Sequence, residues 1–308
     1  MTPARFEYLA PSTVQDALQM LQQHGDGARL LAGGQSLVPA MNLRLANPAY
    51  LIDLNRIPAL AALVQNPDGS ITAGAMTRHR SFEKSELVQR ALPLVHAAMP
   101  WVAHTQIRNR GTIGGSLAHG DPAAEWPALC LLLDCSMLVA GPAGEREIPA
   151  ADFSRGVYET ALEPGEILTA IRFPTWPTER RWGFSEIARR HGDFALAGAA
   201  CILDFDEAGI CRAARLVVFG AADRPLLMEA AGAMLVGRVP ELALAAQVAD
   251  AVREAVTARA DLHASAEYRR DLVGVMTRRA LEQALAQVTA ADTVNRAVNA
   301  VNPVGAAQ

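Results

Sequence analysis

Hydrophobic and polar positions in the N-terminal segment follow the periods of two helices and two strands. Apolar residues on one helical face predict a helix over 12–24, and the apolar run Ala28–Leu31 predicts a buried strand. This run leads directly into the turn Gly33-Gly34. A periodic stretch at 37–45 and an apolar run at 50–54 predict a further helix and strand. A strand–turn–helix–strand unit of this kind is typical of nucleotide-type sites.

The middle third repeats this pattern around a second glycine-rich segment. The loop at 108–116 contains the pair Gly114-Gly115 and lies between two predicted helical stretches. Apolar runs and helical spacing predict the regular elements on either side of it. They are strands at 70–75, 136–140 and 167–173, and helices at 87–103 and 123–133.

The pattern changes after a polar, proline-containing segment at 174–181, which we interpret as a domain boundary. Alternating apolar runs predict an antiparallel sheet, with a hairpin turn at 206–209. Helical stretches and a small, polar tail beyond 290 follow the sheet. The strands are expected at 184–188, 197–205 and 213–219, and the helices at 225–236, 241–257 and 266–288. The sequence therefore predicts an α+β fold.

Composition narrows the class of protein. The 308 residues suit about two domains, at about 150 residues each. With 51% hydrophobic and 19% charged residues, the chain is expected to be globular. A net charge of −4 argues against nucleic-acid binding. No apolar run approaches the roughly 18 residues of a membrane span, and the N-terminus lacks the apolar core of a secretory signal. We therefore expect no membrane insertion and a cytoplasmic location.

The four cysteines do not form a metal-binding pattern. None belongs to a CxxC pair, and no clustered histidine spacing accompanies them. Each lies in an apolar stretch, where a free cysteine usually packs as a small core residue. We therefore expect no metal site and no iron–sulfur cluster within this chain.

The two glycine pairs are the strongest chemical signal. Each can present backbone N–H groups to an anion, because glycine has no Cβ to hold a phosphate away. Ser36, Thr112 and Ser116 add hydroxyl donors beside them. One Gly-Gly pair alone is most often a tight turn, and neither segment is a Walker or a Rossmann motif. Together they favour a cofactor that carries a diphosphate.

Two further clusters allow a structural and a functional interpretation. The turn at 189–195 contains Phe194, which would cover a planar ligand if it were exposed, but a charged turn before a strand has the same composition. His119 invites the role of a general base, yet no partner residue follows from its spacing, so an ordinary turn histidine is the simpler interpretation.

Three long segments of this chain resemble a known family. They are LAGGQSLVPAMNLRL at 31–45, IRNRGTIGGSLAHGDPAAEWPA at 107–128 and ARRHGDFALAG at 188–198. In this order they resemble the FAD-binding medium subunit of molybdenum hydroxylases, such as xanthine dehydrogenase and carbon monoxide dehydrogenase. The resemblance implies a p-cresol methylhydroxylase-type FAD-binding domain at 1–176, with two α/β subdomains at about 1–55 and 56–176. A smaller C-terminal domain of antiparallel sheet and helices would span 177–290, followed by a tail at 291–308.

The same resemblance implies the residues that would contact FAD. The two glycine segments would wrap the diphosphate, Val102 and Phe194 would flank the flavin ring, and Leu168 would meet the cofactor through its backbone. Glu125 stands where the family usually has an aspartate that contacts FAD. The glycine segments are Ala32, Gly33, Gly34, Gln35, Ser36 and Leu37, and Thr112, Ile113, Gly114, Gly115 and Ser116. Relatives often carry a lysine where this chain has Ser185 and Glu186.

The family's division of labour implies partner chains. A large subunit would hold a molybdenum cofactor, and a small subunit would hold two [2Fe–2S] clusters that deliver electrons to FAD on this chain. An external acceptor, whether NAD, quinone, a cytochrome or oxygen, would take them. The assembly would be a dimer of heterotrimers that hydroxylates an N-heterocycle or a purine-like substrate. The alternatives are a stand-alone FAD-dependent oxidase or dehydrogenase, which needs its own catalytic base or a covalent link to the flavin, and a non-enzymatic nucleotide-binding module.

Overall fold

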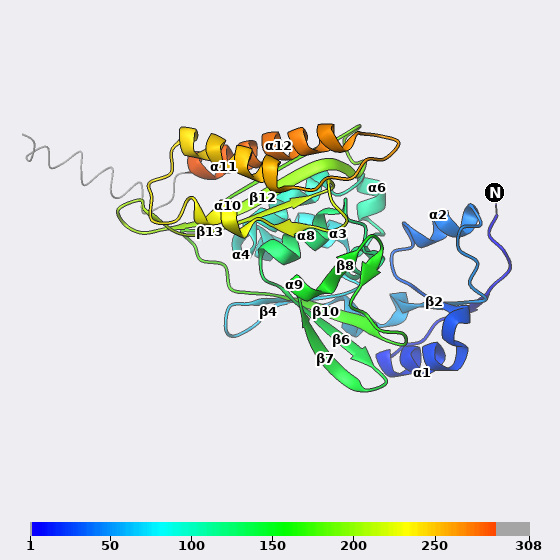
Figure 1. Cartoon of the computed structure of the whole chain (residues 1–308). Helices are drawn as coiled ribbons and strands as arrows, with labels where there is room; N and C mark the ends of the chain where they lie inside the picture. The colour runs from blue at the N-terminus through cyan, green and yellow to red at the C-terminus, as the bar shows by residue number, and fades with distance from the viewer. Residues whose placement is uncertain (1, 288–308) are drawn as a thin grey trace, which may run out of the picture.

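A computed structural model describes residues 2–287, and the predicted tail at 291–308 lies outside this range. The described chain forms sheets of three, five and four strands and a small two-stranded sheet, with helices packed between and over them (Figure 1). This arrangement confirms the predicted α+β class. All four cysteines are free and buried, as expected for small core residues. Within 2–287, no helix is both long and apolar enough to cross a membrane.

The first sheet is parallel and has the order β1-β3-β2. It confirms the strand–turn–helix–strand unit that the N-terminal pattern predicts. Helix α1 begins after Thr13, whose hydroxyl accepts a hydrogen bond from the Asp16 N–H. This helix lies in the connection from β1 to β2. The elements are β1 (Glu7–Leu9), α1 (Val14–His24), β2 (Ala28–Leu31), α2 (Leu37–Asn42) and β3 (Tyr50–Asp53).

The second sheet is antiparallel, with the order β4-β5-β10-β6-β7. Its central strand β10 has the predicted bounds, because its apolar run is buried against neighbours on both sides. Strand β7 was not predicted, since all but one of its residues are exposed and the strand has no apolar alternation. The strands are β4 (Leu63–Gln65), β5 (Ile71–Gly74), β6 (Ser136–Gly141), β7 (Gly144–Pro149) and β10 (Ile167–Phe173).

The single helix predicted over 87–103 is wrong. The chain forms α4 (Glu86–Ala91) and α5 (Pro93–Ala98) instead, because Pro93 lacks the N–H that would continue the first helix. The glycine-rich loop predicted at 108–116 also contains the start of a helix, α7. The other elements of this region are α3 (His79–Lys84), α6 (Thr105–Arg108), α7 (Ile113–His119), α8 (Glu125–Leu132), α9 (Ala150–Phe153), β8 (Ser154–Gly156) and β9 (Glu159–Thr160).

The third sheet is antiparallel, with the order β11-β12-β13-β14, and its first three strands confirm the predicted ones. The predicted helix at 225–236 begins later, because Leu226 and Leu227 pair with β13 as a short strand. The elements are β11 (Arg181–Ala188), β12 (Ala195–Phe205), β13 (Cys211–Phe219), β14 (Leu226–Leu227), α10 (Glu229–Ala233), α11 (Leu242–Ala255) and α12 (Ala266–Ala286).

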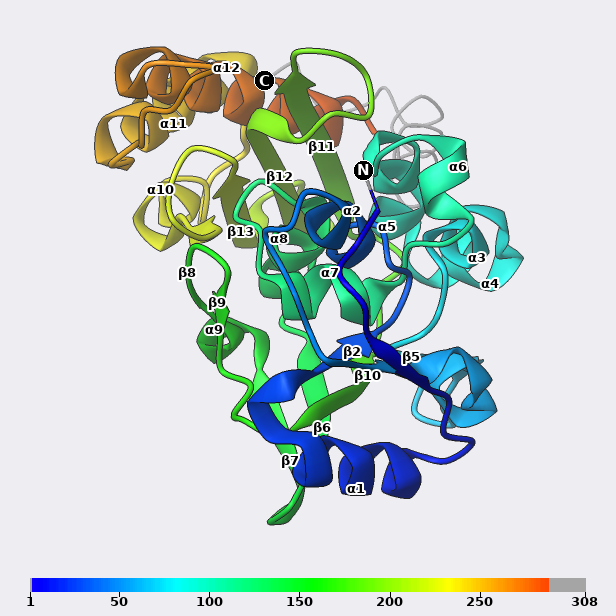
Figure 2. The same cartoon turned by 90° about the vertical axis from the view of Figure 1, so that its right-hand side faces the viewer.

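This third sheet separates two hydrophobic cores. One face presents Phe184, Val217 and Phe219 to the core that contains α8, and the other face packs against α11 and α12. Figure 1 shows these two helices lying over the sheet, and Figure 2 shows α1 and β2 of the N-terminal unit below it. Gly183 allows α12 to lie directly on β11, because a Cβ there would be 1.8 Å from the Ala280 carbonyl oxygen.

Candidate functional site

A cavity of about 850 Å³ lies where the N-terminal unit, the glycine-rich middle segment and the loop before β12 meet. Its volume is in the upper part of the range for cofactor and small-molecule sites. Its wall contains every candidate residue named above except Ile113, whose side chain is fully buried in the neighbouring core. These residues are Ala32, Gly33, Gly34, Gln35, Ser36, Leu37, Val102, Thr112, Gly114, Gly115, Ser116, Glu125, Leu168 and Phe194.

The first glycine segment leaves its backbone donors available. It connects β2 to α2, and Gly34 adopts φ +74°, which favours glycine. Across residues 2–287, no hydrogen bond uses the N–H groups from Gly33 to Ser36, whereas the Val38 N–H donates to the Gly34 carbonyl oxygen at 3.1 Å. Successive free N–H groups in a turn form a concave anion-binding surface. The segment therefore has the geometry that a phosphate group requires.

The second glycine segment uses its backbone donors inside the protein. The N–H groups of Ile113 and Gly114 donate to the carbonyl oxygens of Thr77 at 3.1 Å and Ala75 at 2.8 Å. The Gly115 N–H donates to the Thr112 hydroxyl at 3.0 Å, which makes Thr112 the N-cap of α7. The expectation that this segment presents its N–H groups to an anion is therefore not met at these positions. The Thr112 N–H, for which no hydrogen bond exists within residues 2–287, and the Ser116 hydroxyl are not used in this way, and both residues line the cavity.

The two segments touch each other. A Cβ on Gly33 would lie 2.4 Å from the Arg110 carbonyl oxygen, and one on Gly115 would lie 3.3 Å from the Ala32 Cβ. A Cβ on Gly114 would lie 2.4 Å from the Ala75 Cβ. These glycines let the N-terminal unit, β5 and α7 pack closely enough to form one wall of the cavity.

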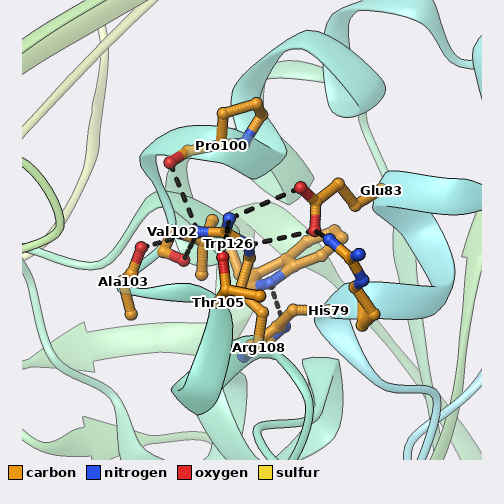
Figure 3. Close-up of polar contacts among 9 residues, drawn as sticks. His79, Glu83, Pro100, Val102, Ala103, Thr105, Arg108 and Trp126 are labelled. Carbon is orange, nitrogen blue, oxygen red and sulfur yellow. Dashed lines mark hydrogen bonds and ion pairs between the residues drawn. The ribbon is translucent and has the colours of Figure 1, made fainter.

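Arg108 fixes the loop that carries Val102. The residue is 6% exposed, and its guanidinium donates to the carbonyl oxygens of Val102 at 3.1 Å and Ala103 at 2.6 Å (Figure 3). Its charge is balanced by Glu83, whose carboxylate lies 3.1 Å from the Arg108 Nε. This network holds Ala103 at φ +50° and keeps Val102 in the cavity wall. Sequence reasoning missed Arg108, because its bonds to backbone carbonyl oxygens and to Glu83, 25 residues away, leave no spacing pattern.

The loop at 189–194 forms another part of the wall. Gly192 has φ +87°, and a Cβ there would lie 2.6 Å from the His104 Nδ1, so only glycine lets this loop approach the loop after Val102. Phe194 is 56% exposed and lines the cavity. The Arg189 Nη1 lies 3.0 Å from the His263 Nδ1, and both residues also belong to the cavity wall. His263 gave no sequence signal, because it lies far along the chain.

A buried histidine supports the floor of the site. The Trp126 Nε1–H donates to the His79 Nδ1 at 2.9 Å (Figure 3), and the His79 N–H donates to the Gly111 carbonyl oxygen at 3.0 Å. Burial, together with the Arg108 and Arg78 charges, lowers the pKa of His79 to about 3. His79 is therefore neutral at physiological pH. His119 also lines the cavity, with its ring 4.9 Å from that of Tyr158.

Two buried carboxyls lie beside the cavity. Burial, with the nearby Asp121 carboxyl, raises the pKa of Glu125 to about 8. Burial, with the Glu125 carboxyl, raises the pKa of Glu186 to about 9. Neither carboxyl oxygen of Glu186 has a hydrogen-bond partner among the described residues. Within the same residues, no group of three or more histidine, cysteine or acidic side chains is arranged to hold a metal.

Comparison with known proteins identifies the family. Residues 4–176 match the family model described as the FAD binding domain in molybdopterin dehydrogenase, and residues 182–284 match the CO dehydrogenase flavoprotein C-terminal domain. The chain belongs to this flavoprotein family. The resemblance seen in the sequence is thereby confirmed, and the chain is an FAD-binding oxidoreductase subunit.

Individual relatives of this flavoprotein match over nearly their full length. The carbon monoxide dehydrogenase medium chain of Afipia carboxidovorans is 40% identical, with 93% of this chain and 99% of the relative covered. The 6-hydroxypseudooxynicotine dehydrogenase complex subunit alpha of Paenarthrobacter nicotinovorans is 39% identical, covering 92% and 96%. The crystal structure of quinoline 2-oxidoreductase from Pseudomonas putida 86 superposes with a TM-score of 0.88 at 38% identity, covering 92% and 98%.

Proposed function

We propose that this flavoprotein carries electrons from the iron–sulfur clusters of a partner subunit, through FAD held in the cavity, to an external acceptor. The observation that carries the proposal is the row of free N–H groups from Gly33 to Ser36 in a cavity of about 850 Å³. The anionic diphosphate of FAD needs such a surface. When bound, FAD can take part in both one-electron and two-electron transfer, so it connects the two.

The proposed contacts follow from the cavity wall. The backbone from Ala32 to Leu37 holds one side of the diphosphate, and the segment from Thr112 to Ser116 forms its other side. This second segment acts through the Ser116 hydroxyl and the Thr112 N–H, because its other N–H groups are bonded within the protein. Val102 and Phe194 lie on the flavin side of the cavity, and the backbone of Leu168 contacts the cofactor. Glu125 contributes a carboxyl to the same wall. Ile113 supports the site from the core.

We further propose the complex in which the chain works. A large subunit with a molybdenum cofactor and a small subunit with two [2Fe–2S] clusters complete it, as a dimer of heterotrimers in the cytoplasm. Relatives that are named medium chain and complex subunit support this arrangement. An N-heterocycle or purine-like compound is the substrate class, since relatives are named for nicotine-derived compounds and quinoline. The chain divides into an FAD-binding domain at 1–176 and a C-terminal domain at 177–290.

The test separates cofactor binding from substrate oxidation. The isolated chain should bind FAD non-covalently in a 1:1 ratio and oxidise neither quinoline nor a purine with an artificial electron acceptor. Adding the two partner subunits should produce substrate turnover when the acceptor is present. When the acceptor is withheld, the substrate should instead bleach the flavin absorbance. A colourless chain that binds no added FAD would reject the proposal. Turnover by the isolated chain without molybdenum would instead support a stand-alone flavoenzyme.

A further inference from the structure

Two buried glutamates lie between the cavity and the third sheet, close enough for the charge of Glu125 to act on Glu186. Glu125 is the first residue of α8 and lines the cavity, and Glu186 lies on β11. Each is only 5% exposed. Both Glu186 oxygens are without a hydrogen-bond donor in the described part of the chain. A carboxylate in that condition is costly, because burial removes its hydration and nothing replaces it.

The register of the sheet turns Glu186 toward α8. Glu186 pairs with Gly198, which pairs with Phe219, so the three residues share one face of the sheet. The Phe219 ring lies over Gly198, where a Cβ would be 2.1 Å away, and belongs to the same core as Trp126 of α8. The Gly220 N–H donates to the Pro122 carbonyl oxygen at 3.0 Å and ties β13 to the turn before α8.

Cations on the neighbouring elements already have other partners. Arg269 of α12 donates to the Leu196 and Gly220 carbonyl oxygens and pairs with Asp261. Arg215 of β13 donates to carbonyl oxygens at the far end of α8. Asp121 adds a third acidic group beside Glu125. Histidines are also present on neighbouring elements, namely His79 of α3, His96 of α5 and His119 of α7.

We propose that Glu125 and Glu186 form a proton-holding pair, which keeps at least one proton between its two carboxyls at neutral pH. Two carboxylates close together in a poorly hydrated wall do not both ionise, because burial and mutual repulsion oppose the second charge. The wall then carries at most one negative charge from the pair, which favours an anionic ligand in the cavity. The pair is a property of the chain itself, so it is tested without FAD.

The pair makes folding stability depend on pH in a defined direction. The pKa values of Glu125 and Glu186 are raised in the folded chain, to about 8 and about 9. Their contribution to stability is therefore complete below about pH 4, where the unfolded carboxyls are also protonated. It is lost progressively as the pH rises through the folded pKa values.

Infrared difference spectroscopy on the full chain without FAD tests the proposal. Wild type minus Glu125→Gln/Glu186→Gln should show a protonated-carboxyl band at pH 7 that disappears toward pH 10. In either single variant, the remaining carboxyl should lose its proton at a lower pH than the pair does, because its repelling neighbour is neutral. Glu254→Gln, on an exposed position of α11, should match wild type. Absence of the band at pH 7, or unchanged titration in both single variants, would overturn the proposal.

Thermal unfolding supplies a second readout. Glutamine is the neutral counterpart of the protonated acid, so the proposal requires that the double variant fold at pH 7. Its Tm should fall less than the wild-type Tm between pH 5 and pH 9. An equal fall in the two proteins, or a double variant that does not fold at pH 7, would contradict a shared proton.

Discussion

The two glycine pairs look alike in the sequence, yet they have different tasks in the structure. The Gly33-Gly34 turn keeps its N–H groups free, whereas the N–H groups of Gly114 and Gly115 are bonded to the protein itself. Gly114 is a glycine because Ala75, the residue after β5, lies against it. A glycine pair near the start of a helix therefore indicates a close approach, and only the structure shows whether a ligand or another part of the backbone approaches.

The sharpest test of this difference is Gly114→Val. A Cβ at this position would lie 2.4 Å from the Ala75 Cβ and 2.7 Å from the Ala75 carbonyl oxygen, so β5 and α7 must separate. We expect a loss of about 3 kcal/mol in the free energy of unfolding, at the upper end of overpacking effects. Urea unfolding followed by circular dichroism measures it. A wild-type midpoint would show that this glycine is not needed for packing.

Gly33→Ala should affect binding more than folding. Its Cβ would lie 2.4 Å from the Arg110 carbonyl oxygen, so the turn must move away from the second segment and misplace its free N–H groups. We expect FAD to bind at least tenfold more weakly, about 1.4 kcal/mol, in a titration of flavin fluorescence. Gly27→Ala is the control, since its nearest neighbour would be 3.8 Å away. Equal FAD affinity in both variants would show that the first turn does not contribute to FAD binding.

Two hydroxyl deletions compare the segments on a finer scale. Thr112→Ala removes the N-cap of α7 and should cost about 1 kcal/mol of unfolding free energy, and Thr112→Ser should restore most of it. Ser36 makes no capping bond, so Ser36→Ala should leave stability within about 0.5 kcal/mol and weaken FAD binding a few-fold. Chemical denaturation and FAD titration of the same samples decide between the two roles. A loss of stability in Ser36→Ala together with a loss of FAD affinity alone in Thr112→Ala would refute these two roles.

The smallest effect on stability is expected at Phe194. Its side chain is 56% exposed, so Phe194→Ala should change the unfolding free energy by less than about 0.5 kcal/mol. If the side chain covers the flavin, the variant should retain FAD but show altered flavin fluorescence. Leu262→Ala, at a fully exposed position, is the matched control. Identical fluorescence in wild type and both variants would make Phe194 an ordinary loop residue.

The sequence predicts elements well where burial imposes a period. Strand β10 and the helices α11 and α12 follow from apolar spacing, because their neighbours bury one face or both. Strand β7 escaped prediction, since its residues face solvent and pairing with β6 holds it in place. The prediction of one helix over 87–103 was wrong, because the apolar periodicity continues across Pro93. The helical hydrogen bonds do not continue there, since proline has no N–H.

The site was only partly visible in the sequence. Contiguous motifs pointed to the glycine segments and Phe194, which the fold brings to one cavity. His79 bonds to Trp126, and Arg108 bonds to backbone carbonyl oxygens and to Glu83; contacts of this kind leave no spacing pattern. Glu186 joins Glu125 only through the register of β11 against its neighbours. Long-range packing therefore decides the part of the site that local patterns cannot describe.

The third sheet has a consequence for any attempt to divide the chain. Its two faces complete two different cores, so β11 to β13 belong to the interior of the first half as much as to that of the second. A fragment that ends in the 174–181 linker would leave α8 uncovered on the side where Val217 and Phe219 now pack. It would also lack the loop that carries Phe194. The two halves should therefore melt together, as a single cooperative unit, although the chain passes from one to the other only once.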